Sequence, residues 1–418
     1  MRRAADANAR GTPDRRRHGQ ALTRMDQPLA GIRVVDLTRI LSGPFCSMLL
    51  GDLGADVIKV EAPGQGDHVR GLGAIVDGMS WYFAGFNRNK RSLTLDLKSD
   101  AGKAVLRRLL ADADVLVENY RPGVLAAMGF DRETLDAINP RLVVGSVNGY
   151  GSTGPYRDRP AFDFITQAMS GFMSVNGSQE SGPMRAAPPL TDLIAGLYTA
   201  FAIVAALRVR DRDGEGQAVE ASMMGGMMSM LAYLSAAQLA TGKTPPATGN
   251  DHPIASPYGL FRAADGHVAV APSTAPTLRR FLEAIGLIGL LDEPRFATNA
   301  NRVANRAALN ALIDDAMWHE TQDVWIERLN AAGVPCGRVQ TLGEVFEDPQ
   351  VAAQEMVLDV PHPGHGTVRM TGFPMKFAKT PSQLRHPAPD LGQDTEAVLA
   401  EAGYDAADIA QLRANGVV

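Results

Sequence analysis

The chain is poor in cysteine: among its 418 residues only Cys46 and Cys336 carry a thiol. The two lie far apart and in no metal-ligand spacing, so the sequence predicts neither a disulfide framework nor a cysteine-bound metal. Cys46 lies in the apolar stretch GPFCSMLL, which is typical of a small buried residue rather than a nucleophile. This cysteine usage fits a reducing compartment, and we expect a cytoplasmic protein.

Three loops that mark common enzyme classes are also missing where the fold would need them. The first strand and helix carry neither G-x-G-x-x-G nor G-x-x-x-x-G-K-[ST], which disfavours the usual binding of a dinucleotide or a nucleotide phosphate. The segments GSTG and MSGF do not supply the G-x-S-x-G turn of a serine hydrolase. Nicotinamide chemistry and hydrolysis through serine are therefore disfavoured.

The sequence has neither a strong charge nor a long, purely hydrophobic run. Its formal net charge of -5 gives no general attraction to nucleic acid or to an anionic membrane, and we expect neither as a partner. The long uncharged run from Met223 contains Gly, Ser, Ala and Gln, which is typical of a helix buried in a core or a subunit interface. Residues 1–27 are rich in arginine and lack the apolar segment of a secretory signal, so they predict a disordered tail.

Strand-like and helix-like segments alternate from residue 28 onward. The apolar segments IRVVDL, DVIKVE, SLTLDL, DVLVEN and LVVGSVN are typical of strands in a parallel sheet with helices on both faces. We therefore expect an α/β fold in which a Rossmann-like large domain binds its ligand beyond the carboxyl ends of the strands. The expected divisions are a large domain over 28–222 completed by 345–418, a helix and linker over 223–257, and a smaller mixed α/β domain over 258–344.

Asp192 directly precedes a long apolar segment, since residues 193–207 carry no charge. Its position at an expected helix start predicts an N-cap. The same position suits a nucleophile, because backbone N–H groups at a helix N-terminus stabilise anions. The residue types alone leave both interpretations open.

The remaining candidate ligands are histidines and basic residues near strand ends. His362 and His365 form HPGH in a Pro/Gly turn with no cysteine or carboxylate set nearby, which is typical of a surface loop, and we predict no metal site. Lys59, Arg70 and Arg91 lie at or near strand ends. They are either solvated loop charges or ligands of a phosphorylated molecule.

Five stretches of the chain resemble the family III CoA-transferases of the formyl-CoA and carnitine-CoA transferase type. One stretch alone would be a weak signal, but together and in this order they are specific. They extend from about residue 28 toward the C-terminus and read PLAGIRVVDLTRILSGPFCSMLLGDLGADVIKVEAPGQGD, NRNKRSLTLDLKS, ADVLVENYRPGVLAAMGFDRETLDAINPRLVVGSVNGYGSTGPY, QAMSGFM and AGVPCGRVQTLGEVFEDPQV.

The resemblance implies that Asp192 is a catalytic nucleophile. Its carboxylate would attack the thioester of an acyl-CoA donor, and CoA would pass through mixed anhydrides and an aspartyl-CoA thioester to a free carboxylic acid. Coenzyme A thioesters and small carboxylic acids are then substrates, and no permanently bound cofactor is implied. Family members are homodimers of two interlocked ring-shaped chains, so a homodimer is expected.

The resemblance also indicates which residues lie near coenzyme A. The candidates by motif are Lys59, Asn119, Tyr120 and Arg121, followed by Arg70 and Arg91. Asp163 is expected to support binding or to orient its loop. Ala62 and Ala127 stand where some relatives carry arginine, so the phosphates of coenzyme A must contact other residues.

The same fold hosts alpha-methylacyl-CoA racemases, which need an acid and base pair beside the thioester. In the corresponding stretches AFD and PYGLFR, Phe162 and Gly259 stand where those relatives have histidine and glutamate. A phenyl ring cannot exchange a proton, so transfer is favoured over racemisation. A third alternative, a protein that binds CoA thioesters without turnover, is disfavoured by the retained Asp192.

Overall fold

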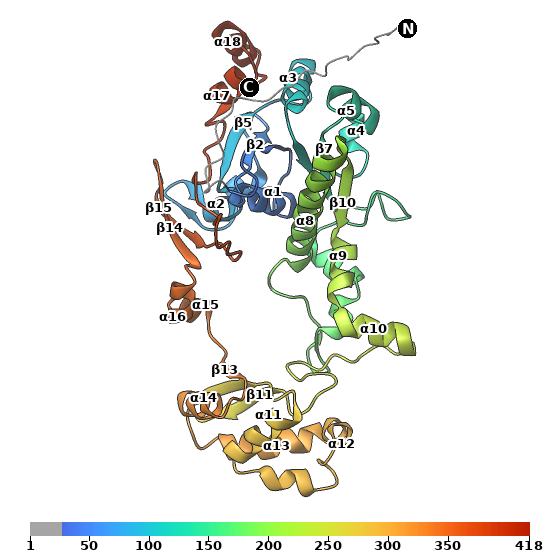
Figure 1. Cartoon of the computed structure of the whole chain (residues 1–418), viewed down its shortest axis with the longest axis vertical. Helices are drawn as coiled ribbons and strands as arrows, with labels where there is room; N and C mark the ends of the chain where they lie inside the picture. Colours follow the sequence, from blue (N-terminus) through green and yellow to red (C-terminus); the bar gives the residue numbers. More distant parts are fainter. Residues whose placement is uncertain (1–26) are drawn as a thin grey trace, which may run out of the picture.

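The computed structural model describes residues 27–418 in two parts. Figure 1 shows a sheet domain at the top and a smaller domain at the bottom. One connection between them passes through α9 (Met223–Met230) and α10 (Ala232–Thr241), and the other through α15 (Leu342–Phe346) and α16 (Pro349–Ala353). The predicted tail lies outside the described residues except for Gln27, whose amide donates to the carbonyl oxygen of Asp52 (3.0 Å).

The sheet domain is built on six parallel strands in the order β10-β7-β6-β1-β2-β5. They are β1 (Arg33–Asp36), β2 (Asp56–Glu61), β5 (Lys90–Thr94), β6 (Val115–Glu118), β7 (Val143–Asn148) and β10 (Ala218–Ser222). The chain adds β2 and β5 on one side of β1, and then β6, β7 and β10 on the other. The direction of strand addition therefore reverses between β1 and β6, where a parallel sheet opens a crevice for a ligand. The predicted α/β fold is confirmed.

Helices cover both faces of this sheet because its strands are apolar on both sides. Neighbouring residues of β1 show this, since Val34 packs under one helical layer and Val35 under the other, both without exposed surface. The first layer contains α1 (Ser42–Asp52) and α8 (Leu190–Asp213). The second layer contains α3 (Asp100–Ala111), α5 (Arg132–Ile138), α17 (Thr395–Glu401) and α18 (Ala406–Ala414). Each fully buried Val, Leu or Ile side chain stabilises the fold by about 1.5–3 kcal/mol.

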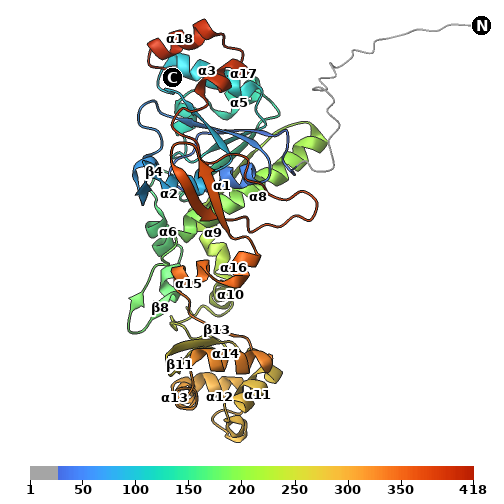
Figure 2. The same cartoon turned by 90° about the vertical axis from the view of Figure 1, so that its left-hand side faces the viewer.

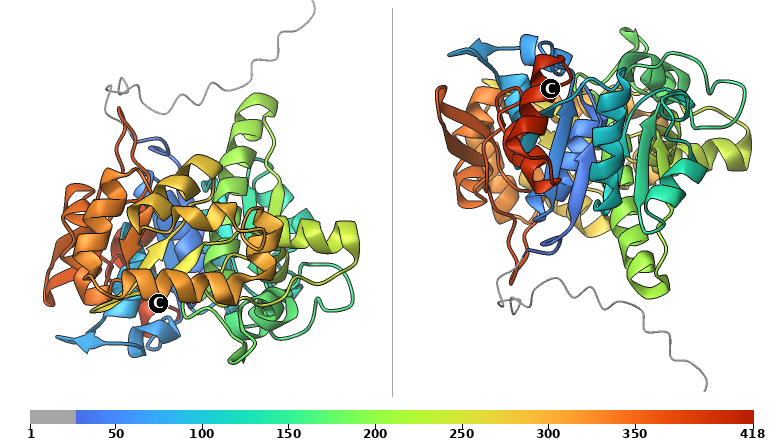
Figure 3. Two further views of the ribbon diagram at one scale, coloured as in Figure 1. Left: turned by 90° about the horizontal axis from the view of Figure 1, so that it is seen from below. Right: turned by 90° about the horizontal axis from the view of Figure 1, so that it is seen from above.

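The two C-terminal helices return to the sheet domain. Viewed from above, α17 and α18 lie along the side of the sheet that ends in β5 (Figure 3, right). The Asp394 carboxylate accepts a hydrogen bond from the backbone N–H of Ser92 in β5 (2.9 Å), and the Leu399 side chain is fully buried. The end of the chain therefore completes the core that its first half begins.

Helix α8 runs across the sheet and touches the start of α1. At Gly196, a Cβ atom would lie 2.4 Å from the carbonyl oxygen of Ser42, so only glycine allows the two helices to approach this closely. By length and composition alone α8 could cross a membrane. In this fold, however, Ala195, Thr199 and Ile203 are fully buried against α1 and the sheet, as in the core helix of a globular domain.

The smaller domain has its own antiparallel sheet and its own core. Its elements are β11 (Gly259–Ala263), β12 (Gly266–Val270), β13 (Cys336–Arg338), α11 (Ala275–Ala284), α12 (Asn299–Ala304), α13 (Arg306–Met317) and α14 (Gln322–Ala331). Phe261, Phe281 and Phe296 are fully buried among these elements. The expected smaller mixed α/β domain is confirmed.

A hairpin of β14 (Val357–His362) and β15 (Gly366–Thr371) is the main element that the sequence did not predict. It packs on the side of the sheet domain, against α2 (Trp81–Asn87) (Figure 2). The HPGH segment forms its turn, as expected, but His362 is buried rather than on the surface. Its Nε2 lies 2.7 Å from the carbonyl oxygen of Ala388.

Candidate active site

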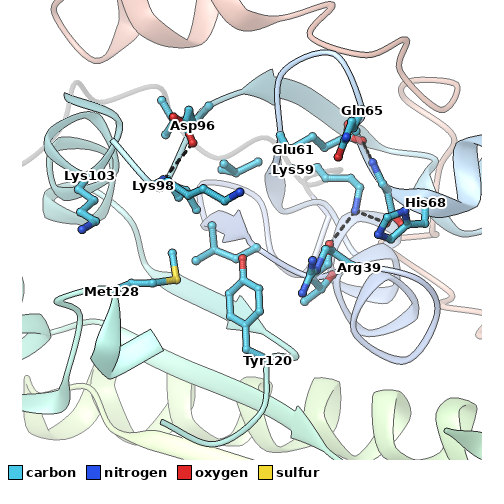
Figure 4. Close-up of a pocket in the computed structure, with 18 of the residues that line it drawn as sticks. Arg39, Lys59, Glu61, Gln65, His68, Asp96, Lys98, Lys103, Tyr120 and Met128 are labelled. Atoms are coloured by element: carbon cyan, nitrogen blue, oxygen red, sulfur yellow. Dashed lines mark hydrogen bonds and ion pairs between the residues drawn. The ribbon is translucent and has the colours of Figure 1, made fainter. Parts of the chain in front are cut away.

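The segment after β1, residues 37–42, lies between two cavities at the carboxyl ends of the strands. The first, here called the β2–β5 cavity, has a volume of about 340 Å³ and is lined by residues that follow β1, β2 and β5 (Figure 4). The second, here called the Asp192 cavity, has a volume of about 260 Å³ and is lined by residues 39–42, 119–122 and 157, 159–162 and by Asp192. Arg39 and Tyr120 line both cavities, with the guanidinium carbon 5.1 Å from the ring centroid. The stacked pair therefore marks the boundary between two adjoining spaces.

Asp192 lies in the first turn of α8, two residues after the helix begins at Leu190. Pro189 occupies the N-cap position and makes no side-chain capping bond. The predicted N-cap role for Asp192 is therefore wrong, because the helix starts earlier than the apolar segment suggested. Its carboxyl group lines the cavity that bears its name.

The environment of Asp192 makes its carboxyl group unusually basic. Burial is the largest cause of a raised pKa, the negative charge of Asp163 adds to it, and a hydrogen bond from the Ser42 hydroxyl opposes both, with a net pKa of about 7. The N-terminus of a helix favours the ionised form, but only by a fraction of the burial effect. A carboxylate that is poised near neutral pH and faces a cavity is typical of a reacting group.

Asp163 holds the start of α8 in place. It is the first residue of α6 (Asp163–Met169), and its Oδ1 accepts hydrogen bonds from the backbone N–H (2.9 Å) and the hydroxyl (2.8 Å) of Thr191. Its Oδ2 accepts a hydrogen bond from the Gln167 amide (2.7 Å). Because Thr191 immediately precedes Asp192, these hydrogen bonds fix the backbone next to Asp192; the supporting role expected of Asp163 stays a prediction.

Asn119 joins the two loops that meet where strand order reverses. Its Oδ1 accepts a hydrogen bond from the backbone N–H of Arg39 (2.9 Å), and its Nδ2 donates one to the carbonyl oxygen of the same residue (2.8 Å). The next two residues, Tyr120 and Arg121, line the Asp192 cavity. The predicted Asn119, Tyr120 and Arg121 are thus brought together, although the amide of Asn119 serves the loop itself.

Lys59 lines the β2–β5 cavity from beneath the loop, with a side chain that has no exposed surface. Its Nζ donates to the carbonyl oxygen of Thr38 (2.9 Å) and to Oδ2 of Asp67 (3.0 Å), and neither side chain of this ion pair has any exposed surface. Asp67 in turn accepts from the backbone N–H of Ile40 through both oxygens (3.1 Å each). Figure 4 shows Lys59 among the residues that line the cavity. The ammonium group predicted to contact coenzyme A therefore already makes two hydrogen bonds within the fold.

This ion pair stabilises a strained backbone. Ile40 has a φ of 70°, in the left-handed region that a β-branched residue rarely adopts. Such strain costs on the order of 1–3 kcal/mol and persists only where surrounding contacts enforce it. Here Lys59 fixes the carbonyl oxygen of Thr38 and Asp67 fixes the N–H of Ile40, so one buried pair determines the course of the loop between the cavities.

Arg70 and Arg91 are also engaged in ion pairs. Arg70 donates to both carboxylate oxygens of Glu61 (2.8 and 2.6 Å), and its guanidinium stacks on the ring of Phe83 at 3.7 Å. Arg91 is the second residue of β5, and its guanidinium forms two hydrogen bonds with the carboxylate of Asp56, the first residue of β2 (2.9 and 2.7 Å). Arg91 therefore lies at the amino end of the sheet, opposite both cavities.

Several basic side chains that the sequence analysis did not identify line the two cavities. His68, Lys98 and Lys103 line the β2–β5 cavity together with Ala62 and Ala127, the two positions where relatives carry arginine. Figure 4 shows the Lys98 side chain reaching into this space. The available signal for Lys98 was its place directly after the strand-like segment SLTLDL; Lys103, inside a helix, offered none. Arg157 and Arg159 line the Asp192 cavity from a segment read only as a loop.

The sequence profile of CoA-transferase family III matches residues 29–395. The chain belongs to CoA-transferase family III. It is 35% identical to succinyl-CoA:glutarate CoA-transferase from Homo sapiens, over 94% of this chain and 90% of that protein. It is 37% identical to acetyl-CoA:oxalate CoA-transferase from Acetobacter aceti, over 90% of this chain and 95% of that protein. A solved CAIB/BAIF family protein from Brucella suis is 38% identical, with a TM-score of 0.81 over 90% of this chain and 100% of that one.

The resemblance inferred from the motifs is confirmed, and this family III CoA-transferase acts on CoA thioesters. The racemase alternative is not favoured. Phe162 lines the Asp192 cavity with a largely exposed ring that carries no exchangeable proton, and Gly259 lies buried in β11 of the smaller domain, outside that cavity. Neither position of the expected acid and base pair therefore holds a titratable group.

Within residues 27–418, no cluster of three or more His, Cys, Asp or Glu side chains could hold a metal ion. His362 and His365 lie close together, with ring centroids 4.7 Å apart, but His365 pairs with Asp390 (2.9 Å) and His362 bonds to backbone carbonyl oxygens. These contacts show that both histidine rings are structural parts of the hairpin.

Proposed function

We propose that this family III CoA-transferase moves CoA from an acyl-CoA donor to a small dicarboxylic acid through covalent intermediates on Asp192. The observation that carries this proposal is the combination of a carboxyl group with a pKa of about 7 and four arginines lining the same cavity, Arg39, Arg121, Arg157 and Arg159. A carboxylate of raised pKa is a better nucleophile than an ordinary one and is still ionised in a large fraction of molecules near neutral pH.

The first half-reaction loads CoA onto the enzyme. An oxygen of the Asp192 carboxylate attacks the thioester carbonyl carbon of the donor, the C–S bond breaks, and CoA leaves as a thiolate. This step forms a mixed anhydride between the donor acyl group and Asp192. The thiolate then attacks the Asp192 carbonyl carbon, which releases the donor carboxylate and leaves an aspartyl-CoA thioester.

The second half-reaction repeats these steps in reverse order with the acceptor. The acceptor carboxylate attacks the aspartyl-CoA carbonyl carbon and expels the thiolate, forming a second anhydride. Attack of the thiolate on the acceptor carbonyl carbon gives the new CoA thioester and regenerates Asp192. No water or proton is consumed, and each tetrahedral intermediate carries a negative charge that the surrounding guanidinium groups stabilise.

We assign the phosphates of coenzyme A to the β2–β5 cavity. Lys98 and Lys103 place positive charge around a space that the small side chains of Ala62 and Ala127 leave open, and His68 lines the same space. The stacked Arg39 and Tyr120 line both this cavity and the Asp192 cavity, so one ligand can extend from one to the other. Lys59 and Arg70 form ion pairs within the fold that support the loop of residues 37–42 from below. Asn119 joins that loop to the loop after β6.

The acceptor class is inferred from relatives. The similar proteins from Homo sapiens and Acetobacter aceti are named for glutarate and oxalate, which are both dicarboxylic acids. A cavity lined by several arginines suits an acceptor that carries two negative charges.

The test of the proposed function is exchange in heavy water. Wild-type protein and the Asp192→Asn variant are incubated with an acyl-CoA donor and an acceptor acid, and every CoA species is followed by mass spectrometry. We expect the wild type to form the acceptor's CoA thioester without deuterium and the variant to form none. A donor thioester that gains one deuterium without transfer would establish racemase chemistry and reject the proposal.

We also propose that the protein is a homodimer. Helices α8 and α10 present large apolar side chains to solvent, with Phe201 73% and Leu239 87% exposed. A second copy of the chain covering these helices would remove that surface from water. Light scattering coupled to gel filtration measures this directly, with a mass near 89 kDa expected for twice the 44.6 kDa chain and a monomer mass rejecting it. A cytoplasmic location stays a prediction.

A further inference from the structure

Arg159 is an arginine of the Asp192 cavity that the fold itself does not use. Within residues 27–418 its guanidinium forms no ion pair and no side-chain hydrogen bond. The neighbouring Arg157 has only a loose contact with Asp158, 3.4 Å long and exposed on both sides, which is worth little in water. Both side chains come from residues 149–162, the segment between β7 and α6. Their charges are therefore available to an anion in this cavity.

The position of Arg159 is fixed by a series of contacts that ends at the nucleophile. Its guanidinium carbon lies 3.8 Å from the ring centroid of Tyr156, and that ring lies edge-on to Tyr150 at 5.9 Å. The Tyr150 hydroxyl donates a hydrogen bond to the sulfur of Met169 in α6 (3.3 Å). The first residue of α6, Asp163, binds the residue before Asp192. The same short helix thus supports both the guanidinium and the nucleophile.

Stacking on a ring leaves the in-plane N–H donors of an arginine free. Those donors match the two oxygens of a carboxylate, and a charge-assisted pair of this kind is among the strongest side-chain hydrogen bonds. We propose that Arg159, with Arg157 beside it, binds the second carboxylate of the acceptor acid while the first carboxylate reacts at Asp192. The inference rests on the proposed function and adds to it the residue that selects dicarboxylic over monocarboxylic acceptors.

The experiment compares two acceptors of equal chain length, glutarate and pentanoate, with one acyl-CoA donor held constant. For wild type and Arg159→Gln, kcat/KM is measured for each acid. We expect the ratio of glutarate to pentanoate to fall by about 10- to 100-fold in the variant, the loss typical of one charged hydrogen-bonded pair. Arg159→Lys keeps the charge but not the planar fork, and its ratio should lie between the two.

The matched control is Arg212→Gln. Arg212 is exposed at the end of α8, pairs with Asp213 and lines neither cavity, so its ratio should equal that of the wild type. An Arg159→Gln variant whose kcat/KM falls equally for both acids overturns the inference. A variant whose KM rises for the acyl-CoA donor alone also overturns it, and would assign Arg159 to coenzyme A.

A readout that does not depend on turnover separates this inference from the proposed function. If the wild type transferred CoA to neither acid, the proposed function would fail. Glutarate binding by isothermal titration calorimetry, in the presence of coenzyme A, would then still decide the role of Arg159. Weaker binding to Arg159→Gln than to wild type supports the inference, and equal binding rejects it.

Discussion

Two groups of cations surround the loop of residues 37–42, and they differ in burial and pairing. Below the loop, Lys59 pairs with Asp67 and Lys90 with Asp36, and all four side chains are fully buried. Facing the cavities, Lys98 and Arg159 are exposed and have no carboxylate partner among the described residues.

The comparison teaches that a basic residue near a strand end has two distinct uses. Each buried cation is already paired with a buried carboxylate, so these ion pairs hold the loop in its conformation. The exposed cations have unused donors, so they can meet the charges of a ligand. Burial and partner, rather than residue type, separate the two uses.

The largest expected effect comes from removing one member of a buried pair. Lys59→Met should destabilise the fold by about 3–5 kcal/mol, because Asp67 would remain as an unpaired buried charge. Urea unfolding at fixed protein concentration measures this. The control is Arg132→Gln, which breaks an exposed pair with Asp136 on α5 and should change stability by less than about 1 kcal/mol. A loss of that small size in Lys59→Met would mean that the ion pair does not hold the loop.

Replacing Asp192 by asparagine is expected to have a smaller effect on stability, and a stabilising one. Its carboxyl pKa is about 7 in the fold and 3.8 in the unfolded reference. The folded state therefore holds the proton more tightly, and the stability that this provides is full below pH 4 and is lost as the pH rises through 7. Because an amide does not ionise, the Asp192→Asn variant does not lose this stability as the pH rises.

The pH dependence tests this account. We expect the variant to exceed the wild type in stability by roughly 2 kcal/mol at pH 8, after allowance for solvent screening, and by much less at pH 4.5. Wild-type transfer should increase with pH through about 7 as Asp192 ionises. An equal stability difference at both pH values would contradict the assigned pKa.

The smallest effect is expected for Lys98 and Lys103, two lysines that line the β2–β5 cavity. Lys98→Gln and Lys103→Gln should each weaken coenzyme A binding by up to about tenfold, or 1.4 kcal/mol, with little change in stability. Calorimetry at two salt concentrations measures the affinity for coenzyme A. Binding by the variants should depend less on salt than binding by the wild type. Lys376→Gln, outside both cavities, is the control. Unchanged affinity in both cavity variants would place the phosphates elsewhere.

Much of the fold was predictable because local patterns agree with it. The apolar segments became the strands of the parallel sheet, and the small-residue run after Asp192 became a packed helix in which Gly196 permits close contact with α1. The β14–β15 hairpin was not predicted, because its register depends on packing against α2 and on a turn formed by HPGH.

The sequence singled out the candidate nucleophile, Asp192, and predicted less of what surrounds it. Asp192 was identified through a resemblance, but its raised pKa depends on burial and on Asp163, which lies 29 positions earlier. Lys59 could not be distinguished from a free cation, because Asp67 reaches it only when the loop folds back. Arg159 was missed because its segment has no periodic pattern; the stack on Tyr156 exists only in three dimensions.

The most direct test of the central claim is detection of coenzyme A on Asp192 itself. Wild-type protein is mixed with an acyl-CoA donor without acceptor, quenched in acid, digested at low pH and analysed by mass spectrometry. The account predicts that the peptide containing Asp192 gains the mass of coenzyme A less one water. A protein that turns over its substrates with no adduct on this peptide, or an Asp192→Asn variant that transfers CoA at a near wild-type rate, would contradict it.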